Sequence, residues 1–489
     1  MISFVTFELS TKEDVPLKRK TVVWVCAILA LVMGLGSAMA EISDETRQAL
    51  DTVMDGVVNR DDGKSLAGLA IEALRDGEVV YKYAGGRRVI DNDDPANDLP
   101  FETDTRVRIA SVSKTFVAVG IMQLAEQGKL DLDADASEYL GFVLRNPNYP
   151  DTAITCRMLL SHTSGIRDGE QYSIAPEHAL RECFEPDGAY YEDGAHFSGE
   201  GEAPGAYFSY ANLNFGVLAT VLEAVSGERF DRYMRAHVLE PMGIGASFSL
   251  SDFDEAALDR LAVIYRKEYD EDGWAVEGSG WVPQFDDLGD RDTDTDTVTV
   301  ANPDSEGGFS FASAKDYVPG TNATIFSPQG GLRISADELA VYVQMFMNGG
   351  TVNGNRILKP ETVDAMFTPV WTWNGSEDES NGDVEGGLFA CWGLGIHIIT
   401  NGAYNGGYGD NFLEDVSAQK LDLAGHYGDA YGEFSIFMLD REAKAGFVYV
   451  CNGTECDYYN EPSYGAYSEN WIWEEEMVTA LYDNIFNAD

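Results

Sequence analysis

Basic residues are scarce in this chain. Of its 489 residues, 33 are Lys or Arg and 83 are Asp or Glu, which gives a formal net charge of −50. A field of that sign repels polyanions, so neither nucleic acid nor an anionic membrane surface is an expected partner. Beyond residue 40 no apolar run is long enough to span a bilayer, so no membrane role is expected of the rest of the chain.

Cysteine is also scarce. There are six cysteines, and Cys26 lies within the first forty residues. The others are Cys156, Cys183, Cys391, Cys451 and Cys456. None has the spacing to a histidine that is typical of a metal site, so we expect no metal and a structural role for these thiols. Cys451 and Cys456 flank the turn-like spacer Asn-Gly-Thr-Glu and are the expected disulfide pair of an exported protein.

The first forty residues have the composition of an export signal. A basic stretch, Lys18-Arg19-Lys20, precedes an apolar run over 21–35, and Ala38-Met39-Ala40 has the pattern of a cleavage site. These features predict a signal peptide over 1–40 and a mature chain in the periplasm or the medium. An uncleaved membrane anchor is the alternative, although the run is short for a spanning helix.

Alternating and helical patterns of apolar residues predict the secondary structure. Segments over 70–74 and 79–83 flank Asp76-Gly77, a strong hairpin signal. Further strands are expected over 391–400, 433–440 and 446–451. Helices are expected at 111–128, 212–225, 230–239 (stopped before Pro241), 335–347 and 469–486. The fourth begins with a capping box, Ser335 to Glu338.

Strands at both chain ends and helices between them indicate an α/β fold. We expect a discontinuous sheet domain over 41–110 and 327–489, interrupted by a mostly helical domain over 111–326. An acidic insertion over 266–325 falls inside the helical part and is expected to be a solvated loop. Its alternating aspartates, Asp290 to Asp296, leave a calcium site as the alternative, although the pattern of an EF-hand is incomplete.

One short motif carries the first candidate for chemistry. Ser111 and Lys114 form Ser-x-x-Lys at the start of an apolar helical pattern. One helical turn places the two side chains on the same face, so the amine comes within reach of the hydroxyl. A serine needs an adjacent base to become a nucleophile, and a lysine shielded from water can lose its proton and act as that base.

Two further segments suggest a cleft. Tyr210 and Asn212 lie two residues apart before an apolar helix, so a phenol and a carboxamide point the same way in an extended turn. A phenol can relay a proton and a carboxamide can hold a substrate amide. The glycine-rich run 425–432 allows close approach of a ligand to the backbone, where an N–H group can complete an oxyanion hole.

Together these segments resemble the family of class C β-lactamases, D-alanyl-D-alanine carboxypeptidases and related esterases and D-peptidases. The family pattern is Ser-x-x-Lys, then Tyr-x-Asn, then Lys- or His-x-Gly, which here is His426-Tyr427-Gly428. Four other segments look like family hallmarks, at 159–165, 239–243, 328–332 and 392–395. The resemblance implies an antiparallel sheet flanked by helices beside an inserted all-helical domain, with the active site between them.

The resemblance also implies a role for each matched residue. Ser111 forms an acyl-enzyme, Lys114 takes its proton, and Tyr210 carries the proton to the leaving group. Substrate is bound by Asn212, His426, Tyr427 and Gly428. The backbone N–H groups of Ser111 and Asp429 form the oxyanion hole. No cofactor is needed, and the partner is a small-molecule or peptide substrate.

Two departures from the family pattern bear on the substrate. A neutral imidazole at His426 attracts a substrate carboxylate less than the usual lysine does. Tyr427 stands where the family has a small residue, so its bulk is expected to narrow the cleft or its hydroxyl to replace the missing one. An amide hydrolase of the D-alanyl carboxypeptidase or D-peptidase type is the main hypothesis. A carboxylesterase, a true β-lactamase and a non-catalytic penicillin-binding or sensing module are the alternatives.

Overall fold

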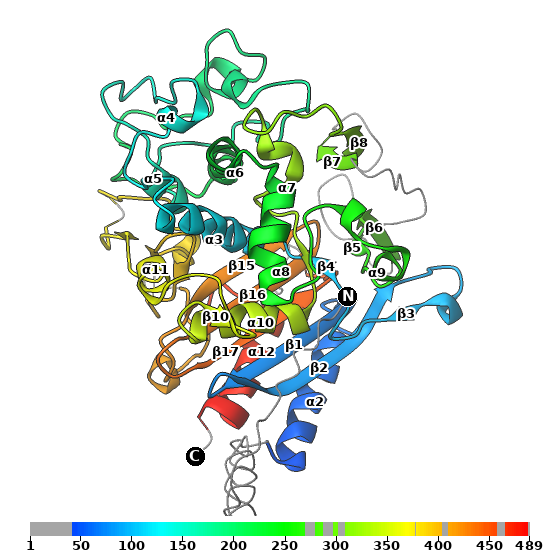
Figure 1. Ribbon diagram of the computed structural model, residues 1–489. Helices are drawn as coiled ribbons and strands as arrows, with labels where there is room; N and C mark the ends of the chain where they lie inside the picture. Colours follow the sequence, from blue (N-terminus) through cyan, green and yellow to red (C-terminus); the bar gives the residue numbers. More distant parts are fainter. Residues whose placement is uncertain are drawn as a thin grey trace, which may run out of the picture. The chain divides into compact units, whose positions relative to one another are not determined.

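The computed structural model describes residues 42–268, 279–286, 297–301, 309–376, 378–402, 409–456 and 465–487, all within the unit Ile42–Asp489 (Figure 1). The expected signal peptide and the run Asp290 to Asp296 lie outside these residues. Within the ranges given, no helix combines the length and apolar character needed to cross a bilayer. The same ranges contain no group of three or more His, Cys, Asp and Glu side chains placed to hold a metal ion.

An antiparallel sheet of nine strands joins the two ends of the chain (Figure 1). Its order is β12-β13-β14-β15-β16-β17-β1-β2-β3. The strands are β1 (Gly68–Arg75), β2 (Glu78–Val89), β3 (Leu99–Pro100), β12 (Trp371–Thr372), β13 (Cys391–Trp392), β14 (His397–Ile398), β15 (Ala424–Ala430), β16 (Glu433–Asp440) and β17 (Ala445–Cys451). β1 pairs with β17 from Leu69 opposite Cys451 to Leu74 opposite Gly446. The fold class predicted from the sequence is confirmed.

The hairpin between β1 and β2 turns where the sequence predicts. Asp76 and Gly77 both have positive φ, 56° and 81°. A two-residue turn of this hand matches the twist of the flanking strands, and aspartate and glycine tolerate it. The strand expected over 391–400 is instead split into β13 and β14. Gly395, between them, has a φ of 71°, which breaks the extended backbone.

Helices cover both faces of the sheet. Successive residues of β16 alternate between two cores: Ile436 and Met438 belong to one, and Phe437 and Leu439 to the other. The first core is closed by α2 (Asp44–Val58) and α12 (Ile472–Leu481). The second contains α10 (Ala336–Met347), which begins with the predicted capping box at Ser335. The period of two along the strand therefore places one helical layer on each side.

The helical part is organised around two buried helices, α3 (Ser113–Glu126) and α6 (Leu213–Ser226). They pack closely at Gly120, where an added Cβ would lie 2.9 Å from Leu222. The shorter helices are α4 (Ser137–Leu140), α5 (Cys156–Leu160), α7 (Phe230–Tyr233), α8 (Glu240–Met242), α9 (Glu255–Leu258) and α11 (Pro360–Met366). The helix expected to stop before Pro241 continues instead through the π-helical turn Met234–Leu239 and α8 to Met242. Proline removes one backbone N–H from a helix, and the π-helical turn directly before it changes the spacing of the hydrogen bonds at this point.

The acidic insertion is not simply a loop. Its described residues form two separate hairpins, β5 (Ile264–Lys267) with β6 (Trp281–Phe285), and β7 (Thr297–Ala301) with β8 (Phe309–Ser313). Asp286, which follows β6, makes a buried ion pair with Arg333 in β9 (Arg333–Ile334). The expectation of a solvated loop is therefore wrong for these segments, which pair as strands and are linked to the rest of the fold through Asp286.

The five cysteines of the described residues are buried, and none of them is in a disulfide. Cys451 ends β17, and its Sγ donates to the carbonyl oxygen of Gly453 at 3.2 Å. The expected disulfide between Cys451 and Cys456 is therefore not formed. Cys451 is paired with a neighbouring strand on each side, which fixes the direction of its side chain. Its sulfur is therefore bonded to the backbone of the following turn and not to Cys456.

Candidate active site

Ser111 lies in a tight turn directly before α3. A 3₁₀ turn, Ala110–Val112, leads into the helix, and Lys114 stands in the first helical turn. Residues three apart eclipse each other in such a turn, so Lys114 Nζ lies 2.8 Å from Ser111 Oγ. Ser111 is half-buried whereas Lys114 is wholly buried. The hydroxyl can thus be reached from outside while the amine beneath it is shielded from water.

A short ladder holds this turn against a distant segment. β4 (Val107–Arg108) pairs with β9, and Ile109 donates its N–H to the carbonyl oxygen of Leu332. The N–H of Leu332 in turn donates to Ser113 Oγ at 3.1 Å. This pairing carries the carbonyl oxygen of Gln329 to 2.9 Å from Lys114 Nζ. The backbone carbonyl group of Gln329 therefore belongs to the site.

Lys114 Nζ has three neighbours within hydrogen-bond distance. They are Ser111 Oγ at 2.8 Å, Asn212 Oδ1 at 2.8 Å and the carbonyl oxygen of Gln329 at 2.9 Å. The last two oxygens only accept, so they use both N–H groups of a neutral amine. The remaining lone pair of that amine is then directed to the hydroxyl of Ser111, the geometry that a general base requires.

Burial gives Lys114 the protonation state that this geometry needs. Desolvation lowers the pKa of Lys114 to about 7, and the carboxylate of Asp168 opposes the shift. A lysine in water has a pKa near 10.4 and is almost always charged at neutral pH. In this site a substantial fraction of the amine is neutral near pH 7, so the base is available.

Asp168 joins the site from a loop that follows α5. It accepts a hydrogen bond from Asn212 Nδ2 and another from the backbone N–H of Leu213, both at 2.8 Å. Burial raises the pKa of Asp168, and these two hydrogen bonds and the charge of Lys114 oppose that shift. Lys114, Asn212 and Asp168 therefore form one continuous chain of polar contacts.

Tyr210 lies in a stack of three rings. Its ring centroid is 4.3 Å from that of His162 and 5.3 Å from that of Phe389, with planes 22° and 20° from parallel. Lys114 Nζ lies 4.9 Å from the centroid of the phenol. Burial raises the pKa of Tyr210 and a hydrogen bond with Ser111 lowers it, the first effect being larger. The phenol is thus a protonated donor beside the hydroxyl and the amine.

The His-x-Gly motif is a strand and not a glycine-rich turn. β15 runs beside the turn of Ser111, and a Cβ on Gly428 would lie 2.5 Å from the carbonyl oxygen of Ile109. His426 is buried, and its ring centroid lies 6.2 Å from that of Tyr210. Burial, aided by the charge of Lys114, lowers the pKa of His426 to about 3. A neutral imidazole therefore faces the site.

Tyr427 is not brought to Ser111. Side chains alternate along β15, and Tyr427 packs against the core beneath the sheet, with its ring 6.1 Å from that of Phe412. The expectation that its bulk narrows the cleft is therefore wrong. Asp429, the next residue but one, is exposed near the end of the strand. The pairing of its N–H with that of Ser111 as an oxyanion hole stays a prediction.

Sequence reasoning missed several residues of the site. Asp168 and Phe389 were not identified as site residues, and His162 and Gln329 were recognised only as parts of motifs. Asp168 follows the hallmark segment at 159–165 by three residues, a signal that was present in the sequence. The contribution of Gln329 is a backbone carbonyl group, for which no side-chain pattern exists.

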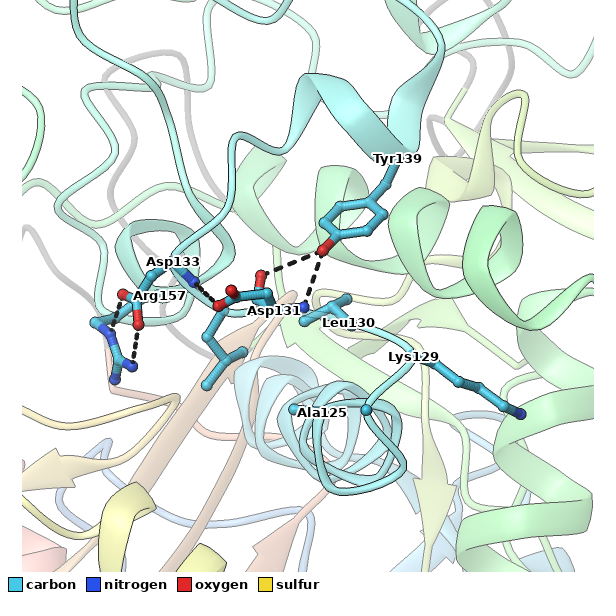
Figure 2. A pocket seen from close by; sticks show the side chains of 9 residues that line it. Ala125, Lys129, Leu130, Asp131, Asp133, Tyr139 and Arg157 are labelled. Atoms are coloured by element: carbon cyan, nitrogen blue, oxygen red, sulfur yellow. Dashed lines mark hydrogen bonds and ion pairs between the residues drawn. The ribbon is translucent and has the colours of Figure 1, made fainter.

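An open cavity of about 460 Å³ lies at the other end of α3 and is a separate feature (Figure 2). Four of its polar residues are paired with one another: Arg157 with Asp133 at 2.7 Å, and the hydroxyl of Tyr139 with the N–H of Asp131 at 2.9 Å. Along α3 its first lining residue, Ala125, lies eleven residues after Lys114 (125 − 114), which is about 16 Å of helix. It adds nothing to the site of Ser111.

Comparison with known proteins identifies a matching family. A family model described as Beta-lactamase matches residues 47–461. The putative penicillin-binding protein PbpX of Bacillus subtilis is 28% identical over 223 residues, which are 44% of this chain and 47% of that protein. The chain thus spans about half the length of the curated relatives it matches.

Two solved structures are similar over most of the chain. The hydrolase EstCE1, described as having promiscuous acyltransferase activity, has a TM-score of 0.57 and 21% identity, and covers 90% of this chain and 100% of its own. The D-amino acid amidase of Ochrobactrum anthropi SV3 has a TM-score of 0.56 and 17% identity, and covers 91% and 100%. At such identities the likeness is one of fold.

Proposed function

The chain belongs to the beta-lactamase family of serine hydrolases, and from this we propose that it cleaves amide bonds through an acyl-enzyme on Ser111. One observation carries the proposal. Lys114 Nζ lies between Ser111 Oγ and two oxygens that only accept, in a buried position where its pKa falls to about 7. This arrangement activates a serine without histidine or metal.

The reaction has two halves. In the first, Lys114 takes the proton of Ser111 while Oγ bonds to the substrate carbonyl carbon. Tyr210 then gives a proton to the leaving nitrogen, the C–N bond breaks, and Lys114 returns its proton to the phenol. In the second half, a water molecule attacks the ester of Ser111 and loses a proton to the same pair of groups. The bond between the acyl carbon and Oγ then breaks, and the pair returns that proton to Ser111 Oγ. Each half conserves protons, so no co-reactant other than water is required.

The surroundings of His426 bear on the substrate. A neutral, buried imidazole offers no positive charge to a substrate carboxylate. This favours amides and peptides that lack a free carboxylate next to the scissile bond. D-Amino-acid amides and D-peptides fit better than penicillins or peptides that end in D-Ala-D-Ala.

A carboxylesterase is the second candidate, because the same neutral His426 also suits an uncharged ester. Rates with short acyl esters, D-amino-acid amides, a D-Ala-D-Ala peptide and nitrocefin separate the candidates. We expect amide turnover with little turnover of nitrocefin. Ester turnover that exceeds amide turnover by orders of magnitude would favour the esterase instead.

The acyl-enzyme itself is tested by covalent labelling. A fluorophosphonate probe should add its mass to the wild-type chain at Ser111, as read by intact-protein and peptide mass spectrometry. The Ser111→Ala variant is the control and should remain unlabelled. A folded wild-type chain that several acylating probes leave unmodified would contradict the proposal.

Export through residues 1–40 is part of the proposal. The basic stretch, the apolar run and Ala38-Met39-Ala40 support it. Expression of the full chain followed by N-terminal sequencing should give a mature protein that starts at Glu41. A chain that keeps residues 1–40 in the membrane fraction would indicate the uncleaved anchor instead.

A further inference from the structure

The carboxamide of Asn212 has two different ends, and the structure uses both. Oδ1 accepts from Lys114 Nζ at 2.8 Å, and Nδ2 donates to Asp168 Oδ2 at 2.8 Å. An ionised carboxylate only accepts hydrogen bonds. Asp168 can therefore face only the NH₂ end of Asn212, which leaves only the oxygen for Lys114.

The orientation of this amide matters because Lys114 acts as a neutral amine. Such an amine has a single lone pair, and the reaction needs that lone pair for the proton of Ser111. If the amide of Asn212 were reversed, its NH₂ group would donate to the lone pair and occupy it. We infer that Asp168 is a positioning residue, which fixes the Asn212 amide so that the lone pair of Lys114 stays free for Ser111.

The backbone also shows this use of Asp168. Asn212 is the N-cap residue of α6, yet its side chain makes no capping hydrogen bond. Asp168 accepts instead from the N–H of Leu213, the first residue of the helix, through Oδ1 at 2.8 Å. The first N–H groups of a helix have no partner within the helix. Asp168 satisfies one of them, while the side chain of Asn212 is bonded to Lys114 and Asp168.

Three titratable groups act on the carboxylate of Asp168. Lys114 attracts its negative charge, whereas the phenols of Tyr172 and Tyr210 have their pKa values raised by it. The neighbouring Arg167 is paired with Glu202 at 2.8 Å. Loss of the charge at Asp168 therefore acts on the base and on the proton relay, in addition to its effect on Asn212.

The role of Asp168 rests on the proposed acylation of Ser111, and it is tested first by Asp168→Asn. An asparagine at 168 keeps an oxygen for Leu213 but turns an NH₂ group toward the NH₂ of Asn212. The amide of Asn212 then reverses, and we expect both acylation by an amide substrate and phosphonylation of Ser111 by a fluorophosphonate probe to slow by about 10²-fold. In turnover, kcat should fall more than KM rises. Glu170→Gln removes the same charge from an exposed residue and is the control, with an unchanged rate.

The second test exchanges the two groups. In the double variant Asp168→Asn with Asn212→Asp, the carboxylate at 212 accepts from Lys114 and from the amide at 168, and the amide oxygen still accepts from Leu213. All donors again face acceptors, so we expect acylation to recover about tenfold over Asp168→Asn above pH 8. Because a carboxylate now touches Lys114, the acid limb of the rate should move to higher pH.

The outcomes separate the two claims. Normal acylation of Asp168→Asn, or a double variant no faster than Asp168→Asn, overturns the role of Asp168 while the acyl-enzyme stands. A wild-type chain that stays unlabelled overturns the acyl-enzyme and this role together. Thermal melting of each variant identifies any that fail to fold, and the double variant, which keeps every hydrogen bond, remains informative in that case.

Discussion

The imidazole of His162 lies almost flat against the phenol of Tyr210, with ring centroids 4.3 Å apart. Through Nδ1 the same imidazole accepts the backbone N–H of Ala211 at 3.1 Å. His162 therefore holds both the ring and the backbone of the Tyr210-Ala211-Asn212 segment. Its own backbone has a φ of 54°, a conformation that is uncommon for a residue other than glycine and tends to occur at functional sites.

The variant His162→Phe should keep the ring stack and lose the acceptor. The buried N–H of Ala211 is then left without a partner, which costs about 1–3 kcal/mol. We expect urea denaturation to show that loss in the free energy of unfolding, together with a lower kcat. His237→Phe, at an exposed histidine, is the control and should change stability by less than about 0.5 kcal/mol. Equal effects of the two substitutions would contradict the assignment.

The pH dependence of kcat/KM should show a single acid limb near pH 7. Lys114 acts as a base only when neutral, and its pKa of about 7 lies below the ordinary value, so activity rises as pH increases through about 7. His426, with a pKa of about 3, stays neutral from pH 5 to 9 and adds no limb. Rates with an uncharged substrate from pH 5 to 9 test this. Lys114→Ala should abolish the rate and Lys129→Ala, at an exposed lysine, should not. A flat profile would refute the role of Lys114.

Contacts between residues that are close in the chain could be predicted from the sequence. Ser111 and Lys114 meet through the geometry of one turn, and Asp76-Gly77 makes its hairpin through its own backbone preferences. Both follow from a few adjacent residues. The strands near both chain ends were predicted from local patterns of apolar residues, and together they placed the sheet.

Contacts between residues that are far apart in the chain could not be predicted in this way. The carbonyl oxygen of Gln329 reaches Lys114 only because β4 and β9 pair across more than two hundred residues. Tyr427 was assigned to the cleft by its place in the His-x-Gly motif, within the glycine-rich run 425–432. Once that run is a strand, the period of two sends His426 and Tyr427 to opposite faces.

Replacement of His426 by lysine should change substrate preference. An ammonium group at this position attracts a substrate carboxylate, and a gain of about 1.4 kcal/mol lowers KM about tenfold. We expect His426→Lys to lower KM for a penicillin and to leave KM for its methyl ester unchanged. The like charge should also lower the pKa of Lys114 and move the acid limb to lower pH. A parallel change for both substrates would show that His426 does not face the substrate.

The variant Phe389→Ala should weaken the support of Tyr210 on its outer side. Phe389 is half-buried and stacks on the phenol at 5.3 Å, and such a pair contributes about 0.5–1.5 kcal/mol beyond burial. We expect kcat/KM to fall about two- to tenfold, most for substrates with a bulky apolar leaving group. Phe367→Ala removes a half-buried ring that packs against Phe346, away from Tyr210, and is the matched control. An equal loss with both variants would indicate a general effect on packing.

The ion pair between Arg333 and Asp286 links the insertion to the backbone that serves Lys114. Its two nitrogen–oxygen contacts are 2.9 and 3.0 Å long, and the guanidinium also donates to the carbonyl oxygen of Gly331, two residues after Gln329. Removal of one partner of a buried pair leaves an uncompensated charge and costs about 3–5 kcal/mol. Asp286→Asn should therefore lower both the free energy of unfolding and kcat.

An exposed ion pair provides the comparison for Asp286. Asp104 contacts Arg260 at the surface, where removal of a charge costs about 0–1 kcal/mol. Asp104→Asn should therefore leave both stability and kcat nearly unchanged. If Asp286→Asn lowers stability without lowering kcat, the insertion supports the fold alone. If it lowers both, the position of the Gln329 carbonyl oxygen depends on this anchor, and the insertion contributes to the geometry in which Lys114 activates Ser111.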